Sequence, residues 1–328
     1  MSLPHSTFTE LVSTTLRNHK GDMSDNVTNH NALLRALNKK GRKVFEDGGN
    51  SLVCGLDYQE NGTFQRFSGY DALNIAASDV ITSAEYNWKN SVVNVTAAGD
   101  EIRKNSGSKT RIMNLVEERV NNAVRTMKNN TSTDVYSDGT LSNQINGLQA
   151  ICPDTAGGSL GGIDGDTWTF WQSVVQSAAA PLTGSSITLS ESTFEKFMRQ
   201  AYIAATRGED MPDLLLLDNN YYELFEGSQV SNKRYTTDTN LSKDKASAGF
   251  VSLKYKSADV YHDGGSGIPA SHGFFVNTDY LKYVCHTDAD MSEIPEQRSI
   301  NQDAVVIPMI TMHNITCSNR SLQAVLKA

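Results

Sequence analysis

The sequence is poor in cysteine, and its cysteines do not have metal-site spacing. Cys54, Cys152, Cys285 and Cys317 stand far apart in a chain of 328 residues. No pair shows the C-x-x-C spacing that is typical of a zinc site. Four scattered thiols in a chain of this length are typical of reduced, small apolar residues in a cytosolic setting. We therefore predict neither a disulfide framework nor a structural metal.

Long apolar runs are also missing. No stretch of about 18 apolar residues occurs, and no charged-then-apolar leader is visible, so we predict no membrane span and no signal peptide. The net charge of −8 argues against a protein that binds along the whole length of a nucleic acid. Basic residues nevertheless gather between Arg35 and Lys43. We interpret this run as a solvated helix end, with an arm that touches nucleic acid or an acidic partner as the alternative.

Catalytic motifs are scarce. The histidines show no H-x-x-x-H or H-E-x-x-H spacing, and no G-x-S-x-G elbow occurs. The glycine-rich stretch GGSLGGIDGD at 157–166 lacks the Gly-Lys-[Ser/Thr] of a phosphate-binding loop and a preceding apolar strand. We interpret it as a loop that precedes the aromatic cluster Trp168, Phe170 and Trp171.

The segment from Cys285 to Glu293 contains residue types that could form a catalytic or cation-binding site. Cys285 and His286 are adjacent in a predicted strand, so their side chains point to opposite faces and cannot easily form a nucleophile–base pair. Asp288, Asp290 and Glu293 are candidate cation ligands, although calcium needs six or more oxygens in a tight loop. We predict no catalytic residue, no cofactor and no metal site, and hence no enzyme.

Apolar periodicity and capping residues predict helices at a few places. The strongest signal predicts a long helix over about 108–136, which is ended by Asp138-Gly139. Shorter helices are predicted over Asn31–Asn38 with Ser24 or Asp25 as the cap, over Phe194–Thr206 with Ser190 or Ser192 as the cap, and over Tyr221–Phe225 with Asp218 as the cap.

Strand signals surround these helices. Ser51–Tyr58 and Thr63–Phe67 flank Asn61-Gly62, which predicts a tight hairpin with too few large apolar residues to form its own core. An extended return segment is predicted over Ile81–Val95. Further strands are predicted over Leu214–Leu217, Phe250–Tyr255, Ala258–His262, Gly273–Val276, Lys282–His286 and Ala304–Thr316, the last interrupted by Pro308.

An arm, a long strand excursion, a long helix, an α/β middle and a returning strand follow one another in this order. This order resembles the major capsid proteins of tailed bacteriophages of the Hong Kong 97 type. Local stretches spread over nearly the whole chain carry the resemblance: NALLRALNKKG, GGNSLVCGLDYQENGTFQRFSGYDAL, YNWKN, DGTLSNQINGLQAI, GGIDGDTWTFWQ, FFVNTDYLKY and INQDAVVIPMIT.

The resemblance implies an α+β, Hong Kong 97-like capsid fold. It divides the chain into an N-terminal arm (1–45), an extended β-hairpin loop (46–104), the spine helix of a peripheral domain (105–138), an α/β axial domain (139–300) and a C-terminal return to the peripheral domain (301–328). The hairpin would then lie on a neighbouring subunit. Candidate inter-subunit contacts are Tyr58, Asn61, Phe64, Arg66, Phe67, Tyr70, Trp88, Leu33 and Leu37.

The function implied is that of a major capsid protein. Its copies would form the pentamers and hexamers of an icosahedral shell that encloses double-stranded DNA without sequence specificity. Implied partners are other copies of the chain, a scaffolding protein, a portal and a decoration protein, with no membrane; the expected location is the virion, and the host cytoplasm during assembly. Because the sequence reaches its arm at once from Met1, we expect a separate scaffolding protein or none.

Residues 44–88 contain no lysine, so the outer part of the loop lacks the amine that some relatives cross-link, and we predict a non-covalent shell. Two alternatives remain open at this point. One is an encapsulin-like nanocompartment shell with an enzyme cargo. The other is a cytosolic hydrolase that uses Cys285 or the acidic residues Asp288, Asp290 and Glu293.

Overall fold

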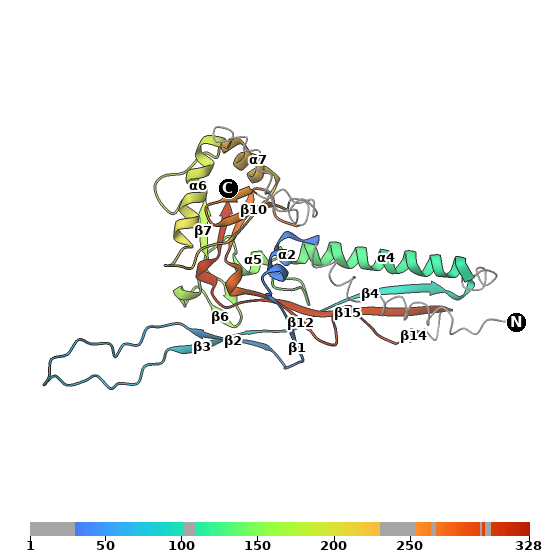
Figure 1. Ribbon diagram of the computed structural model, residues 1–328, viewed down its shortest axis with the longest axis horizontal. Helices are drawn as coiled ribbons and strands as arrows, with labels where there is room; N and C mark the ends of the chain where they lie inside the picture. The colour runs from blue at the N-terminus through green and yellow to red at the C-terminus, as the bar shows by residue number, and fades with distance from the viewer. Residues whose placement is uncertain (1–29, 102–108, 230–252, 264–266, 296, 299–302) are drawn as a thin grey trace, which may run out of the picture.

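A computed structural model describes residues 30–101, 109–229, 253–263, 267–295, 297–298 and 303–328. Figure 1 shows a central body from which a hairpin projects at one end and a long helix, lying along a sheet, extends at the other. The α-helices are α2 (Ala32–Lys39), α4 (Lys109–Asp134), α5 (Leu148–Ile151), α6 (Glu191–Ala204) and α7 (Asn219–Ser228).

Strands make up most of the remaining regular structure. They are β1 (Lys43–Glu46), β2 (Leu52–Asp57), β3 (Ile81–Tyr86), β4 (Lys89–Ala98), β5 (Ser159–Leu160), β6 (Ile163–Asp164), β7 (Val174–Ser177), β8 (Leu214–Leu217), β9 (Leu253–Tyr255), β10 (Ala258–His262), β11 (His272–Val276), β12 (Leu281–His286), β13 (Ser292–Glu293), β14 (Gln297–Arg298), β15 (Ala304–Cys317) and β16 (Ala324–Lys327). Short 3-10 turns are η1 (Thr169–Trp171), η3 (Thr278–Tyr280) and η4 (Arg320–Leu322).

Polar caps begin the shorter helices. Ser190 and Thr193 form a reciprocal capping box at the start of α6, and Asp218 accepts the backbone N–H of Tyr221 in α7, as predicted. The cap of α2 differs from the prediction. The side chain of Asn31 accepts from the backbone N–H groups of Leu33 and Leu34, whereas Ser24 and Asp25 lie outside the described residues.

The long helix is confirmed. α4 has 26 residues, which corresponds to about 39 Å at 1.5 Å per residue. One side of α4 packs on β4 and β15 through a separate apolar cluster, which contains Val120, Ala123, Val124 and Met127 of the helix, Val95 and Ala97 of β4, and Val305, Ile307 and Met309 of β15, together with Met291. The helix and the two strands together form the long extension in Figure 1.

The α/β part contains the sheet β7-β16-β11-β8-β10-β9, in which β8 is parallel to β10 and antiparallel to β11. Both faces of this sheet are covered. Leu214 and Leu216 of β8 belong to one core cluster, while Leu215 and Leu217 belong to a second that includes Phe194 of α6. A strand buried on both faces can be continuously apolar, which accounts for the four consecutive leucines.

The strand β15 connects the two ends of the molecule. It pairs with β12 near its C-terminal end and with β4 along residues 304–313. The predicted interruption at Pro308 is wrong: Pro308 pairs with Asn94 within an unbroken register. Proline removes only its own N–H from the ladder, and the Pro308 carbonyl still accepts from the Ile294 N–H at 2.9 Å.

The tight hairpin predicted around Asn61-Gly62 is also wrong in its pairing. β2 pairs with β3, from Leu52 opposite Tyr86 to Asp57 opposite Ile81, and the stretch Thr63–Phe67 forms no strand. The return segment around Ile81 is confirmed as β3 and β4. The hairpin is therefore wider than predicted, and residues 58–80 form the long loop that Figure 1 shows at its end.

Candidate inter-subunit surface

The loop of residues 58–80 exposes large apolar side chains to an unusual extent. The exposed fractions are 79% for Phe64, 66% for Phe67, 107% for Tyr70 and 93% for Ile75. These side chains belong to none of the core clusters of the described residues. Exposed apolar side chains of this size are typical of interaction surfaces, so the loop is a candidate inter-subunit surface.

Two polar residues predicted as contacts lie in the same loop. The side-chain oxygen of Asn61 accepts from the backbone N–H of Thr63 at 3.0 Å and from its hydroxyl at 2.7 Å, so Asn61 shapes the turn. The Arg66 guanidinium lies 5.8 Å from the centroid of the Phe64 ring, within the range of a cation–π contact. Arg66 therefore remains at the surface beside the exposed aromatic rings.

Tyr58 and Trp88 differ from the exposed aromatic residues of the loop, because both pack against their own chain. The Tyr58 ring lies 5.5 Å from the ring of Phe170 and 5.9 Å from that of Trp168. The Trp88 indole donates to the Gly49 carbonyl at 3.0 Å and packs at the edge of the core. Both side chains are half-buried, so they fix the base of the hairpin within its own subunit.

For Leu33 and Leu37 the expectation of a neighbour contact is wrong. Both side chains are 0% exposed and belong to the main core cluster of their own chain. The N-terminal end of α2 is also held in place, because Asn31 donates to the Ser132 hydroxyl at 3.0 Å and the Ala32 N–H donates to Asp263 at 3.2 Å. The apolar stripe of α2 was visible in the sequence, but its partner was not.

Three residues of the basic run at the end of α2 pair with carboxylates of the same chain. Lys40 pairs with Asp213 at 2.6 Å, and Arg42 pairs with Asp279 at 3.0 Å. Lys43 pairs with Asp290 at 3.2 Å, with only 7% of its side chain exposed. Carboxylates of the same chain thus neutralise much of the charge that the sequence concentrates here.

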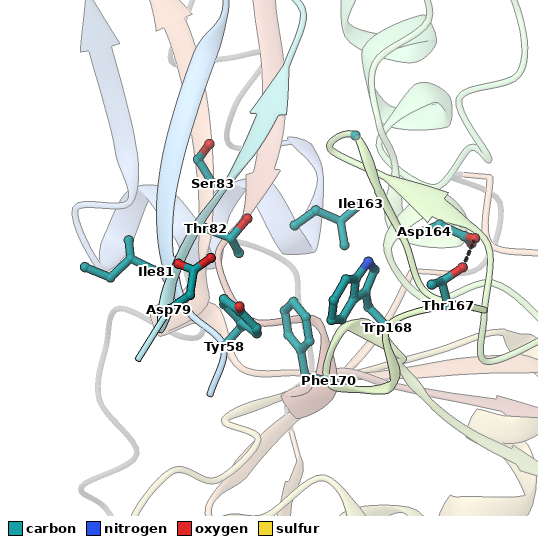
Figure 2. Close-up of a pocket in the computed structure, with 11 residues that line it drawn as sticks. Tyr58, Asp79, Ile81, Thr82, Ser83, Ile163, Asp164, Thr167, Trp168 and Phe170 are labelled. Carbon is teal, nitrogen blue, oxygen red and sulfur yellow. Dashed lines mark hydrogen bonds between the residues drawn. The ribbon is translucent and has the colours of Figure 1, made fainter. Parts of the chain in front are cut away.

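A cleft lies at the base of the hairpin (Figure 2). It has a volume of about 400 Å³ and separates β3 from the loop that contains β5, β6 and η1. In Figure 2 the rings of Tyr58, Phe170 and Trp168 stand side by side between the two walls, and Asp164 accepts from the Thr167 hydroxyl at 2.8 Å. That hydrogen bond, followed by one from the Asp166 N–H, lowers the pKa of Asp164, so its carboxylate stays ionised.

A second exposed surface lies on the strands β4 and β15, on the side turned away from α4. We call it the outer sheet face. It is made by the residues that alternate with those packed on α4, namely the apolar Val92, Val306, Pro308, Ile310 and Met312 and the polar Asn90, Asn94 and Thr96 of β4. Val92 is 56% exposed, and the four β15 residues are half-buried. The long extension therefore presents apolar groups on the side that its own helix does not cover.

The residues considered for catalysis form no catalytic arrangement. Cys285 is buried, and burial, followed by the charge of Asp290, raises the pKa of its thiol to about 12, so the reactive thiolate is disfavoured. Asp290 pairs with Lys43. Among the described residues, no group of three or more His, Cys, Asp or Glu side chains is arranged to hold a metal ion. The helices of the described ranges include none with the length and apolar character of a bilayer span.

Sequence reasoning missed the residues that support the hairpin. Arg320 is 1% exposed although it is an arginine, and its guanidinium donates only to backbone carbonyls in the hydrogen bonds observed. Gly161 contacts β3 directly. The glycine-rich stretch at 157–166 signalled an unusual backbone, but nothing in the sequence linked it to Arg320.

Neither a protein-family model nor a curated protein matches this chain. Solved structures do. The capsid asymmetric unit of cyanophage A-1(L) is 17% identical with a TM-score of 0.62, and the match covers 89% of this chain and 92% of that chain. The capsid of the empty GTA particle is 11% identical with a TM-score of 0.54, covering 88% of each chain.

A structure from Mycobacterium phage Bobi is 9% identical with a TM-score of 0.52, and the match covers 88% of this chain and 89% of that chain. Identities this low establish the fold alone. The chain has the α+β fold of these capsid structures, as the sequence predicted.

Proposed function

We propose that this chain is the major capsid protein of a tailed bacteriophage. Its copies form the pentamers and hexamers of an icosahedral shell, and the shell encloses double-stranded DNA. The observation that carries the proposal is the loop of residues 58–80, whose exposed apolar side chains have no place in their own core, on a chain with a capsid fold. In this proposal the chain is a structural protein and not an enzyme.

The positions of the two exposed surfaces support a head-to-tail contact. The hairpin projects at one end of the molecule, and the outer sheet face lies on the extension at the opposite end (Figure 1). We propose that the loop of one copy, through Phe64, Phe67 and Tyr70, covers the outer sheet face of the next. A heterologous contact of this kind generates a closed ring when its rotation closes, which is the geometry that pentamers and hexamers need.

The same proposal assigns each segment of the chain to a part of the shell subunit. We assign residues 1–45 to an N-terminal arm, 46–104 to the extended loop, 105–138 to the peripheral domain and 139–300 to the axial domain near the five- and six-fold axes. Two boundaries differ from the expected division. The end of the loop segment, β4, joins the peripheral domain by pairing with β15, and the C-terminal return (301–328) ends in β16, which pairs with β7 and β11 in the axial sheet. The described part of that arm, α2 and β1, is integrated into the body. Each contact can be modest, because many act at once in a closed shell.

Partners are proposed on the same basis. A scaffolding protein and a portal would direct assembly in the host cytoplasm, a decoration protein would bind the finished virion, and DNA would be contained without sequence specificity. The net charge of −8 and the pairing of Lys40, Arg42 and Lys43 within the chain favour containment over tight DNA binding.

Sedimentation and electron microscopy of the chain, co-expressed with scaffolding and portal proteins, test the proposal. We expect shells, and nuclease-protected DNA in particles from infected cells; an enzyme cargo in place of DNA would indicate a nanocompartment. Tyr70→Ser and Val92→Lys should each reduce the yield of shells at least ten-fold. Leu141→Ser, which replaces a side chain that is 68% exposed outside both surfaces, is the control. A chain that stays monomeric or dimeric with all partners present would contradict the proposal.

A further inference from the structure

The loop 157–171 contains β5, β6 and η1 and lies against the base of the hairpin. We call it the hairpin seat. Besides the apolar side chains of Leu160 and Trp171, which join the main core cluster, a buried arginine holds its backbone in place. The Arg320 guanidinium donates to the carbonyl oxygens of Ile151 at 2.7 Å, of Gly157 and Gly158 at 2.9 Å each, and more weakly of Trp171 at 3.4 Å and Ala150 at 3.5 Å.

A buried guanidinium with carbonyl acceptors is a demanding arrangement. The free-energy cost of removing the guanidinium from water is compensated only while the backbone carbonyls stay within hydrogen-bond distance. Trp171, which is 1% exposed, adds a hydrogen bond from its indole to the Leu160 carbonyl at 2.9 Å. Gly165 lies so close that a Cβ there would come within 3.3 Å of the guanidinium. The seat is therefore a rigid support despite its many glycines.

The seat contacts the hairpin at two separate points. At the inner end of the ladder, the Gly161 carbonyl accepts from the Glu85 N–H at 2.9 Å. A Cβ on Gly161 would lie 3.0 Å from the Cβ of Ala84 and 3.1 Å from the ring of Tyr86, so only glycine allows this approach. Tyr86 is fixed in turn, because its hydroxyl donates to the Cys317 carbonyl at 2.8 Å.

The second contact lies at the outer end of the ladder. Tyr58 follows the last residue of β2, and its ring packs on Trp168 and Phe170 of the seat. Along the strand, the two contacts are about 17 Å apart, from five residues at 3.4 Å each. A single contact would leave the hairpin free to swing about it, whereas two separated contacts determine its direction.

We infer that the hairpin seat, organised by Arg320, sets the direction in which the hairpin leaves its subunit, through Gly161 and Tyr58 as positioning residues. The inference concerns a single subunit, and its consequence for assembly rests on the proposed shell function. In that function the direction of the hairpin decides where its loop contacts the next copy. A tilt of about 10° at the base moves the end of a hairpin arm of about 35 Å by about 6 Å. Such a displacement exceeds the tolerance of close-packed contacts.

Two adjacent glycines provide a matched pair of variants. Gly161 and Gly162 both have positive φ, 61° and 79°, so alanine strains the backbone at either position. A Cβ on Gly162, however, would meet nothing within 4 Å. Only Gly161→Ala pushes the seat away from β3. Tyr58→Ala removes the outer contact, and Tyr58→Phe retains the ring as its control.

The measurement is the distance distribution between spin labels at the exposed positions Glu60 and Asn129 of the unassembled full-length chain. We expect one narrow distribution for the unmodified chain, Gly162→Ala and Tyr58→Phe, and a shift or broadening of several ångströms for Gly161→Ala and Tyr58→Ala. Because Tyr58 is only half-buried, its variant keeps the test valid even where Gly161→Ala does not fold.

Coinciding distributions for Tyr58→Ala and Tyr58→Phe would overturn the inference, as would an unmodified chain whose distribution is already as broad as that of Tyr58→Ala. Electron microscopy of the same variants with scaffolding and portal proteins separates the two proposals. If the labels respond as expected but no variant and no unmodified chain forms shells, the seat stands and the shell function fails. If shells form normally while the label distances stay the same in every variant, the shell function stands and the inference about the seat fails.

Discussion

The Tyr283 hydroxyl lies 2.6 Å from Nδ1 of His313 in the buried contact between β12 and β15. Burial raises the pKa of Tyr283 well above its ordinary value, so its phenol keeps its proton beside the imidazole. The other ring nitrogen, Nε2, faces the Ser91 hydroxyl at 3.4 Å. This pair buries a titratable group at the junction between the body and the long extension.

The His313 ring makes the stability of the fold depend on pH. Burial lowers its pKa to about 4, with a contribution from Lys43 that Asp290 opposes. The unfolded chain therefore binds the proton first, and stability that is fully present above about pH 6.5 is lost as the pH falls toward 4. Between pH 7 and pH 4.5 we expect His313 to account for a loss of about 2 kcal/mol in the free energy of unfolding.

Denaturant unfolding at both pH values measures this loss. His313→Gln should be less stable than the unmodified chain at pH 7 and should lose less stability on acidification. His262→Gln, at an exposed histidine, is the control and should follow the unmodified chain. Equal acid losses in the unmodified chain and His313→Gln would show that His313 does not titrate in this window.

Arg320→Lys tests the framework of the seat. A lysine ammonium is a compact charge without the planar fork of arginine, so it cannot reach carbonyls on both sides of the site. Leaving buried carbonyls unpaired should cost about 2–4 kcal/mol in the free energy of unfolding. Arg207→Lys, at an exposed arginine, should change stability by less than about 0.5 kcal/mol. Equal stabilities of the two variants would mean that the buried guanidinium contributes little.

Leu33→Ala tests whether α2 is part of the body. Because Leu33 is 0% exposed, its truncation should lower the free energy of unfolding by about 2–5 kcal/mol. Lys39→Ala, on the exposed side of the same helix, should have an effect below about 0.5 kcal/mol. Thermal unfolding of the two purified variants compares them directly. A wild-type midpoint for Leu33→Ala would indicate that α2 detaches from the body in solution.

The absence of lysine from residues 44–88 predicts a shell without covalent links through the hairpin loop. When purified particles are boiled in detergent and reductant, this chain should run as one band near 35.9 kDa on a denaturing gel, apart from the bands of other virion proteins. The reductant removes adventitious disulfides of the free cysteines, of which Cys54 is half-buried. A ladder at multiples of the subunit mass would contradict the prediction.

Much of the body could be predicted locally. The long helix, the buried strand at Leu214–Leu217 and the caps Ser190 and Asp218 follow from periodicity and capping chemistry, which involve residues close in sequence. The hairpin pairing could not be predicted in this way. Asn61-Gly62 satisfies a short-range rule, but the partner of β2 is β3, and the sheet contacts that hold β3 decide this choice.

The inter-subunit contacts predicted from the sequence also fall into two groups. Phe64, Phe67 and Tyr70 were recognised because the sequence offered them no local core, and the structure leaves all three exposed. Leu33 and Leu37 form an equally clear apolar stripe, yet the main core covers them. An apolar stripe shows that a side chain needs a partner, but it does not show whether that partner belongs to the same chain.

The sequence by itself determined the order of the main elements and indicated that the hairpin lacks a core of its own, because apolar periodicity, caps and composition are properties of neighbouring residues. The α+β fold class was implied by the resemblance to capsid proteins. The tertiary structure alone decided the course of the hairpin. Arg320 meets the carbonyls of Gly157 and Gly158 across more than 160 positions of chain, with separations of 163 and 162. No local pattern encodes such a contact, because it exists only once the chain has closed around it.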